Sequence, residues 1–208
     1  METDEKINKL YKELSQFNLS PFNKLHYRTG RIIMSKNFKF RYYYSEIIES
    51  PDRQDKITII MFNPALANID KPDKTINNVY KIIKDYTKYR EFEIFNLFNI
   101  RNSNPSCNKE AGLEKNLLLL EKLLKVENNN NILLAWGNLL YKKYKITHNE
   151  LKIFEKLFAN KQLYVVKFTK KKQPIHLSTR NNKYIYPLKR LKRVNISQII
   201  NCQLIKTQ

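Results

Sequence analysis

Glycine is scarce in this sequence: the 208 residues include only three, Gly30, Gly112 and Gly137. Dinucleotide loops of the Gly-x-Gly-x-x-Gly type and Walker-type phosphate loops need closely spaced glycines, because their backbone must approach a phosphate. No stretch of the chain supplies that spacing. The sequence therefore excludes the nucleotide-cofactor folds built on these loops, and we expect no cofactor.

Cysteine and histidine are also few. The two cysteines, Cys107 and Cys202, lie far apart in the sequence, and His26, His148 and His176 form no ligand-spaced cluster with them. Structural zinc sites need such clusters, so we expect no metal. Unpaired thiols are typical of a reducing cytoplasm.

Long apolar runs are absent as well. A membrane-spanning helix needs about 18 or more consecutive apolar residues, and no such run occurs. The N-terminal segment from Met1 to Lys9 is charged throughout and has no apolar signal-peptide core. We therefore expect a cytoplasmic protein with no membrane partner.

Acidic residues are missing from the last quarter of the chain. Glu155 is the last of them, and residues 156–208 contain thirteen of the 39 Lys and Arg in a chain of formal net charge +20. Aromatic side chains interleave with these cations, as they do in surfaces that bind phosphates and stack on bases. A solvated basic surface is the alternative interpretation. We expect DNA, single- or double-stranded, as the partner.

The apolar pattern predicts an α/β fold. Helical spacing in residues 4–17 and strand-like alternation in residues 30–48 indicate an N-terminal helix and a β-hairpin. Beyond them, short apolar stretches alternate with amphipathic ones, which is typical of parallel strands joined by helices. The strands are expected at residues 57–62, 92–95, 131–135 and 163–168, and the helices at 74–89, 109–126 and 138–158.

We predict a single domain over residues 1–208. Residues 1–52 form an N-terminal helix and hairpin extension, and residues 53–208 form an α/β core with a basic C-terminal segment. The core is expected to be a three-layer α/β/α sandwich around a mainly parallel four-stranded sheet. With 42% hydrophobic residues, the chain can bury such a core.

Polar residues follow the predicted strands. Asn63, Asn96 and Gly137 come after the first three strands, and His176 lies in the loop after the last. Parallel sheets bind their ligands at the carboxyl ends of the strands. We therefore expect these residues to meet at one edge of the sheet.

Four segments of the chain resemble uracil-DNA glycosylases, a likeness that implies the glycosylase fold. IFNLFNIRNSNP at residues 94–105 and NILLAWGNLLYKK at residues 131–143 are similar to the second strand motif and the Leu-Trp-Gly strand of that superfamily. IIMFNPALA at residues 59–67 is similar to its water-activating loop, and PIHLST at residues 174–179 to its minor-groove loop. The same segments resemble more closely an uncharacterised bacterial domain-of-unknown-function family, number sixteen forty-three, with Asn-Pro, Asn-Leu-Phe, Ala-Trp-Gly and His motifs.

The resemblance implies roles for individual residues. Asn96 would read the Watson–Crick edge of an extruded pyrimidine, since an amide offers a donor and an acceptor side by side. His176 would stabilise charge on the leaving base, and Asn63 would orient the attacking water. Pro64 and Ala65 would contact the base. From the residues alone, Asn96 can instead cap a turn, and His176 can be a surface side chain.

Two departures from the glycosylase motifs favour weak catalysis. Asn63 and Ala65 stand where the efficient branch has an aspartate and a thymine-excluding tyrosine. Loss of a general base costs about 10²–10⁴-fold in rate, although a mismatch-specific branch with asparagine works slowly. Asp70 and Asp73 are the only acids near this loop, and Asp73 is expected to cap a helix. Asn63→Asp is expected to raise cleavage.

We therefore expect a glycosylase-like pseudo-enzyme that binds DNA or a pyrimidine base and has weak or absent base-excision activity. One alternative is an active uracil or mismatch DNA glycosylase. Another is a non-enzymatic partner of a small acidic DNA-mimic protein. Arg101 can contact DNA or cap the edge of the sheet. The residues expected to contact the DNA backbone are Arg101, Lys170, Lys171, Lys172, Ser178 and Arg180.

Overall fold

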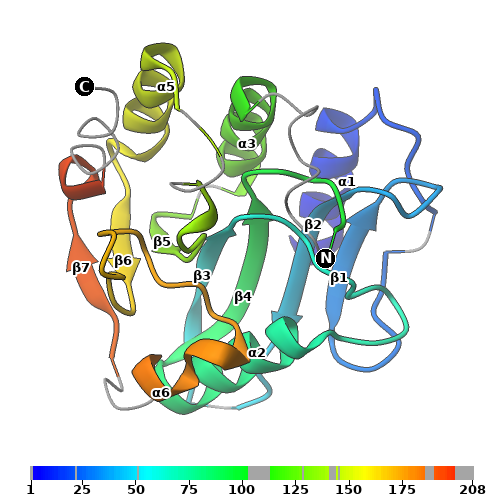
Figure 1. The fold of residues 1–208 in the computed structure, drawn as a ribbon. Helices are drawn as coiled ribbons and strands as arrows, with labels where there is room; N and C mark the ends of the chain where they lie inside the picture. Colours follow the sequence, from blue (N-terminus) through cyan, green and yellow to red (C-terminus); the bar gives the residue numbers. More distant parts are fainter. Residues whose placement is uncertain are drawn as a thin grey trace.

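The strands of the described chain form one sheet, and helices cover both of its faces (Figure 1). The computed structural model describes residues 2–21, 23–50, 52–102, 113–127, 129–140, 144, 146–185 and 190–199. Several sequence expectations fall outside these ranges. They concern Cys107, Cys202, the predicted helix start at 109–112 and part of the predicted helix at 138–158.

The sheet has seven strands in the order β1-β2-β4-β3-β5-β6-β7. The inner strands β4, β3, β5 and β6 pair in parallel, whereas β1, β2 and β7 join antiparallel at the two edges. The strands are β1 (Gly30–Met34), β2 (Arg41–Ile47), β3 (Gln54–Met61), β4 (Tyr89–Asn96), β5 (Asn131–Leu134), β6 (Gln162–Val165) and β7 (Lys192–Val194).

The prediction of a mainly parallel four-stranded sheet is therefore wrong: the fold is α/β, but its sheet is larger and mixed. The hairpin does not stand apart, because β2 pairs with β4 from Tyr44 opposite Ile94 to Ile47 opposite Glu91. At the other edge, Lys192–Val194 pairs with β6. Both additions provide partners for backbone groups that an edge strand would otherwise leave unpaired.

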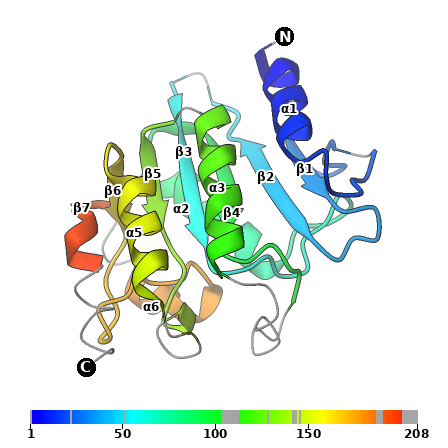
Figure 2. The ribbon, with the colours of Figure 1, turned by 90° about the horizontal axis from the view of Figure 1, so that it is seen from above.

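Helices α1 (Glu2–Glu13), α3 (Leu113–Glu127) and α5 (His148–Phe158) cover one face of the sheet (Figure 2). Helix α2 (Lys74–Tyr86), a 3₁₀ turn at Thr179–Asn181 and the short α6 (Asn182–Ile185) cover the other. The start of α2 is fixed by an N-cap aspartate, and α5 begins with a capping box between Thr147 and Glu150.

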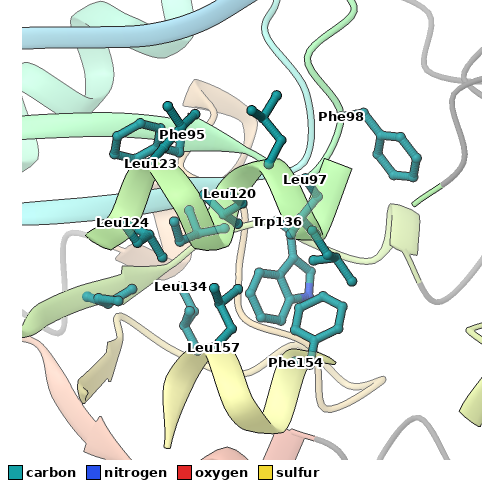
Figure 3. Packing of buried hydrophobic residues seen from close by; sticks show 14 of the residues in the cluster. Phe95, Leu97, Phe98, Leu120, Leu123, Leu124, Leu134, Trp136, Phe154 and Leu157 are labelled. Atoms are coloured by element: carbon teal, nitrogen blue, oxygen red, sulfur yellow. The ribbon is translucent and has the colours of Figure 1, made fainter. Parts of the chain in front are cut away.

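Each face has its own apolar cluster. Trp136 is fully buried in the cluster under α3 and α5, with its ring 5.9 Å from that of Phe154 (Figure 3). Its indole Nε1 donates to Gln173 Oε1 at 3.2 Å. Trp136 therefore packs the core and ties the loop after β6 to the end of β5.

The strand order places a topological switch point between β3 and β5. From β3 the chain passes through α2 on one face to β4, and then through α3 on the other face to β5. At such a point the loops leave the two strands in opposite directions, and α/β proteins commonly bind their ligands there, at the carboxyl ends of the strands. The strand order therefore predicts a ligand site at the carboxyl edge of the sheet.

Candidate functional site

Buried polar atoms without a hydrogen-bond partner concentrate at the carboxyl end of β4. Within the described ranges there are six such side-chain atoms, and five of them belong to Arg41, Asn96 and Arg101. The sixth is Oε2 of Glu93. An unpaired buried polar group costs about 1–3 kcal/mol, so native structures contain few of them. We call these three residues the carboxyl-edge cluster, and their concentration marks a candidate binding site.

Asn96 is the last residue of β4 and is 2% exposed. Phe92 and Ile94 belong to the apolar cluster under α2, so strand alternation directs Asn96 to the same face. Neither Nδ2 nor Oδ1 has a partner in the described part of the chain. The amide therefore caps no turn there, and both its donor and its acceptor are unsatisfied in the described part of the chain.

The loop after β3 contains Asn63, Pro64 and Ala65. The Asn63 amide nitrogen donates to the carbonyl oxygens of Pro64 at 3.0 Å and Asn102 at 2.7 Å. Both partners are acceptors, so this end of the side chain must be the NH₂ group. Pro64 is buried and its carbonyl oxygen also accepts from the Asn102 N–H, while Ala65 is half-buried. Asn63 thus has its Oδ1 left to orient a water.

Asp73 organises this loop as well as capping α2. Its Oδ1 accepts from the Thr75 and Ile76 N–H groups at 2.8 and 2.9 Å, and its Oδ2 accepts from Leu66 and Ala67 N–H groups, both at 3.1 Å. A carboxylate with both oxygens engaged in this way is a poor substitute for a general base. The expected cap is therefore present, and it also fixes the loop that follows Asn63.

Asp70, the other acid near this loop, lies away from the cluster. It is exposed and pairs with Nδ1 of His26 at 3.1 Å. Its carboxylate therefore belongs to a surface hydrogen bond with that histidine.

His176 lies where the loop after β6 crosses the end of β5. Gly137 permits the approach: it has a φ of +72°, and a Cβ at this position would come within 2.9 Å of the His176 Cβ. The Gly137 N–H donates to the Pro174 carbonyl oxygen at 2.9 Å, and the Asn181 side chain donates to the His176 carbonyl oxygen at 2.7 Å. These contacts fix the position of the His176 backbone.

Burial lowers the pKa of His176 to about 4, against a smaller opposing effect of the Asp73 carboxylate. The imidazole is therefore neutral at physiological pH, with one nitrogen as donor and the other as acceptor. A neutral histidine can donate a hydrogen bond to a base without adding a charge to the site.

Arg41 is a site residue that the sequence did not identify. It begins β2, is 2% exposed, and its Nε and Nη1 are unpaired within the described residues. Ile33 pairs with Tyr43 but Met34 pairs with Arg41, so Tyr42 is an extra residue in β2. This bulge directs Arg41 to the face of Tyr44, whose ring lies 5.2 Å from the guanidinium. If the side chains of this strand alternated regularly between the two faces, the sequence would predict that Arg41 faces solvent together with Lys39.

Arg101 connects three loops of the edge. Its Nη1 donates to the Phe38 carbonyl oxygen and its Nη2 to the Leu66 carbonyl oxygen, both at 2.7 Å. Two of its three nitrogens are thus used to hold the hairpin turn and the loop after β3. This geometry favours the edge-capping interpretation of Arg101 over a phosphate contact.

The predicted DNA-binding lysines lie on a turn before His176. Lys170, Lys171 and Lys172 are exposed, and the turn is closed by the Lys172 N–H donating to the Thr169 carbonyl oxygen at 2.9 Å. Ser178 is half-buried at the start of the 3₁₀ turn, and Arg180 is exposed within it. These side chains therefore border the edge of the sheet and are not buried in it.

Three surface hollows lie away from the carboxyl-edge cluster. Hollows of about 370, 430 and 490 Å³ occur at the amino edge of the sheet, between α3 and α5, and beside the hairpin turn, and none is lined by the carboxyl-edge cluster. Among the residues with described positions, no three His, Cys, Asp or Glu side chains are placed to hold a metal ion. No described helix is both long enough and apolar enough to span a membrane.

One protein-family model matches the chain: the family described as "Protein of unknown function (DUF1643)", over residues 41–176. The matched segment begins at Arg41 and ends at His176, and it includes Asn63, Asn96 and Arg101. No curated protein and no solved structure matches the chain.

Proposed function

The chain belongs to the DUF1643 family of proteins of unknown function, and from its carboxyl edge we propose that it binds a pyrimidine base, free or extruded from DNA, in the manner of a uracil-DNA glycosylase. Base excision is weak or absent. The proposal rests on the unpaired amide of Asn96.

Asn96 supports the proposal because its amide matches a pyrimidine edge. A uracil presents an acceptor at O4 beside a donor at N3–H, which an asparagine side chain can satisfy with Nδ2 and Oδ1. An extruded base brings these groups to a buried position without leaving them unpaired. Binding would thus remove the cost of the two unsatisfied atoms of Asn96.

His176 and Asn63 define what chemistry is available next to that base. A neutral His176 can donate to O2 of the bound pyrimidine and favour negative charge on it. Asn63 can orient a water through Oδ1 but cannot take its proton as a carboxylate does, and Asp73 has its oxygens engaged. These properties favour base recognition over fast hydrolysis.

The exposed Lys170–Lys172 turn and Arg180 support DNA as the source of the base. Cations beside a base-reading edge can contact the phosphates that flank an extruded nucleotide. Such contacts position the strand but do not read its sequence.

A single-turnover assay tests the function. Labelled single- and double-stranded oligonucleotides would contain uracil, a thymine mismatch or no lesion, and binding would be measured in the same samples at two salt concentrations. We expect salt-sensitive binding with a preference for uracil, little or no cleavage, and loss of the preference in Asn96→Leu.

Two results would contradict the proposal. Rapid lesion-dependent cleavage that disappears in His176→Asn would establish an active glycosylase. Equal affinity for lesion and control oligonucleotides, unchanged by Asn96→Leu, would show that Asn96 reads no base.

A further inference from the structure

Arg41 is a buried cation that forms no ion pair with any acid whose position the structure describes. No side-chain hydrogen bond from its guanidinium is found within the described residues, and Nε and Nη1 are inaccessible to water. Removing a charge from water costs several kcal/mol unless a partner compensates it. Burial accordingly lowers the pKa of Arg41, although a guanidinium stays protonated at neutral pH.

The neighbouring acids are already engaged. The Asp73 carboxylate acts on Arg41 electrostatically, but its oxygens accept four backbone N–H groups. Glu46, on the same strand as Arg41, pairs with Arg28 at 2.9 Å and also accepts from the Tyr44 hydroxyl. Besides Asp73, the ionisable groups that act on Arg41 are Tyr27, Tyr44 and Arg101, which carry no negative charge at neutral pH.

Arg41 and Asn96 occupy the same part of the sheet. The Arg41 N–H donates to the carbonyl oxygen of Asn99, three residues after Asn96, at 2.9 Å. Both side chains are directed to the face covered by α2, Arg41 by the bulge at Tyr42 and Asn96 by strand alternation. In the described part of the chain, an amide and a cation without hydrogen-bond partners therefore lie on the same face of the sheet, at its carboxyl edge.

We propose that the base recognised at this edge is an anionic pyrimidine, with Asn96 reading its amide edge and Arg41 neutralising its negative charge. The charge is either that of a carboxylate substituent or, in a free base, that of the ring after its N1–H has released its proton to solvent, which leaves the N3–H that Asn96 reads in place. This inference rests on the proposed function, because it assigns the substrate class of the same site. It makes Arg41 a specificity-determining residue.

A planar anion suits the site better than a phosphate group. A tetrahedral phosphate is best held by several converging donors, whereas Arg101, the second cation of the cluster, already donates from two nitrogens to backbone carbonyls. A pyrimidine anion spreads its charge over a flat ring edge, which one guanidinium and one amide can contact together.

Isothermal titration calorimetry of the full chain tests the inference. The probes are 5-carboxyuracil, uracil and orthophosphate, titrated into the wild type, Arg41→Met and Asn96→Leu. We expect 5-carboxyuracil to bind the wild type at least about tenfold more tightly than uracil, a difference that one charge-assisted contact can supply. Uracil binding measured in two buffers of different ionisation heat should show release of a proton.

In Arg41→Met, both the preference for 5-carboxyuracil and the proton release should disappear while uracil still binds. The variant should fold, because replacing an unpaired buried cation by an apolar side chain removes a desolvation cost. A thermal melt checks this, and Arg41→Lys provides a second variant that retains the charge but not the planar donors.

The outcomes separate the two proposals. Equal binding of 5-carboxyuracil and uracil to the wild type would overturn the anionic substrate class, and so would a preference for 5-carboxyuracil that survives in Arg41→Met. In either case the proposal of base recognition would still hold if Asn96→Leu abolishes binding. If orthophosphate competes with 5-carboxyuracil in the wild type but not in Arg41→Met, the site binds phosphate and the anionic substrate class is overturned. Failure of every pyrimidine to bind would overturn both proposals.

Discussion

Unpaired amide atoms distinguish Asn96 from the other buried asparagines. Asn78 donates to the Leu177 carbonyl oxygen at 2.9 Å, and Asn129 donates to the Lys56 carbonyl oxygen at 3.1 Å. Asn96 is as buried as these residues but has no partner in the described part of the chain. Since the same chain pairs its other described buried amides, the exception at the end of β4 is the feature that the proposed base contact explains.

The contacts of Asn63 argue against the expectation that Asn63→Asp raises cleavage. Asn63→Asp would replace the donor between the Pro64 and Asn102 carbonyl oxygens by a carboxylate oxygen that repels them. We therefore expect the variant to lose about 1–3 kcal/mol of unfolding free energy in urea denaturation, and cleavage not to rise. Unchanged stability together with faster cleavage would show that the side chain rotates freely and that only a base was lacking.

His176 should make stability depend on pH. Its pKa is about 4 in the folded chain and 6.5 in an unperturbed state, so between these values the unfolded chain binds a proton that the folded chain does not. Stability is therefore lost as pH falls through this window. Between pH 7 and pH 4.5 the wild type should lose about 2 kcal/mol more than His176→Asn, as measured by urea denaturation at both pH values. Equal losses would contradict the lowered pKa of His176.

The sequence predicted Asn96 and His176 as site candidates because strand ends can be read from apolar runs followed by polar residues. Arg41 was missed for a specific reason. Residues 38–42 alternate between aromatic and cationic side chains, which indicates that Arg41 faces solvent. One extra residue in β2, Tyr42, reverses that assignment. A bulge depends on the pairing partner, and local alternation does not encode it.

At the scale of elements, the end of β5 positions the His176 loop. Gly137→Ala would place a side chain at a φ of +72° and within 2.9 Å of the His176 Cβ. The conformation alone costs about 1–2 kcal/mol, and the contact should displace the loop. We expect lower stability in denaturation together with shifted ring signals of His176 in NMR spectra. A variant with wild-type stability and signals would show that the two loops are not coupled.

The sequence pattern predicted the inner strands of the sheet but not how its edge strands pair. The four parallel strands lie within a few residues of their predicted positions, because β3, β4 and β5 contain short runs buried on both faces and β6 is a short apolar run. The pairing of β2 with β4 and of β7 with β6 depends on contacts between distant segments. Lys192–Val194 in particular has no apolar alternation, and its strand is defined by the edge of β6.

At the scale of the whole molecule, we expect the excess positive charge to bind DNA beside the carboxyl edge of the sheet. Replacing Lys170, Lys171 and Lys172 together by Gln should weaken DNA binding at low salt and lower the slope of log affinity against log salt by about 2–3, because up to three phosphate contacts are lost. Fluorescence anisotropy over a salt series provides the measurement. The matched control removes the same charge from the exposed Lys81, Lys84 and Lys88 at the opposite edge.

An equal change of slope in both lysine variants would indicate attraction by net charge alone. An unchanged slope in the Lys170–Lys172 variant would move the DNA contact to another surface. Loss of slope only in that variant would support an interface beside His176.

The most direct test of base recognition compares Asn96→Leu with Asn78→Leu. The first removes an unpaired buried amide and should leave stability unchanged or raised while abolishing the preference for uracil-containing over lesion-free oligonucleotides. The second breaks hydrogen bonds to Leu177 and Asn182 and should lower stability by about 1–3 kcal/mol, with the preference kept wherever the variant is folded. A preference that survives in Asn96→Leu would contradict the account.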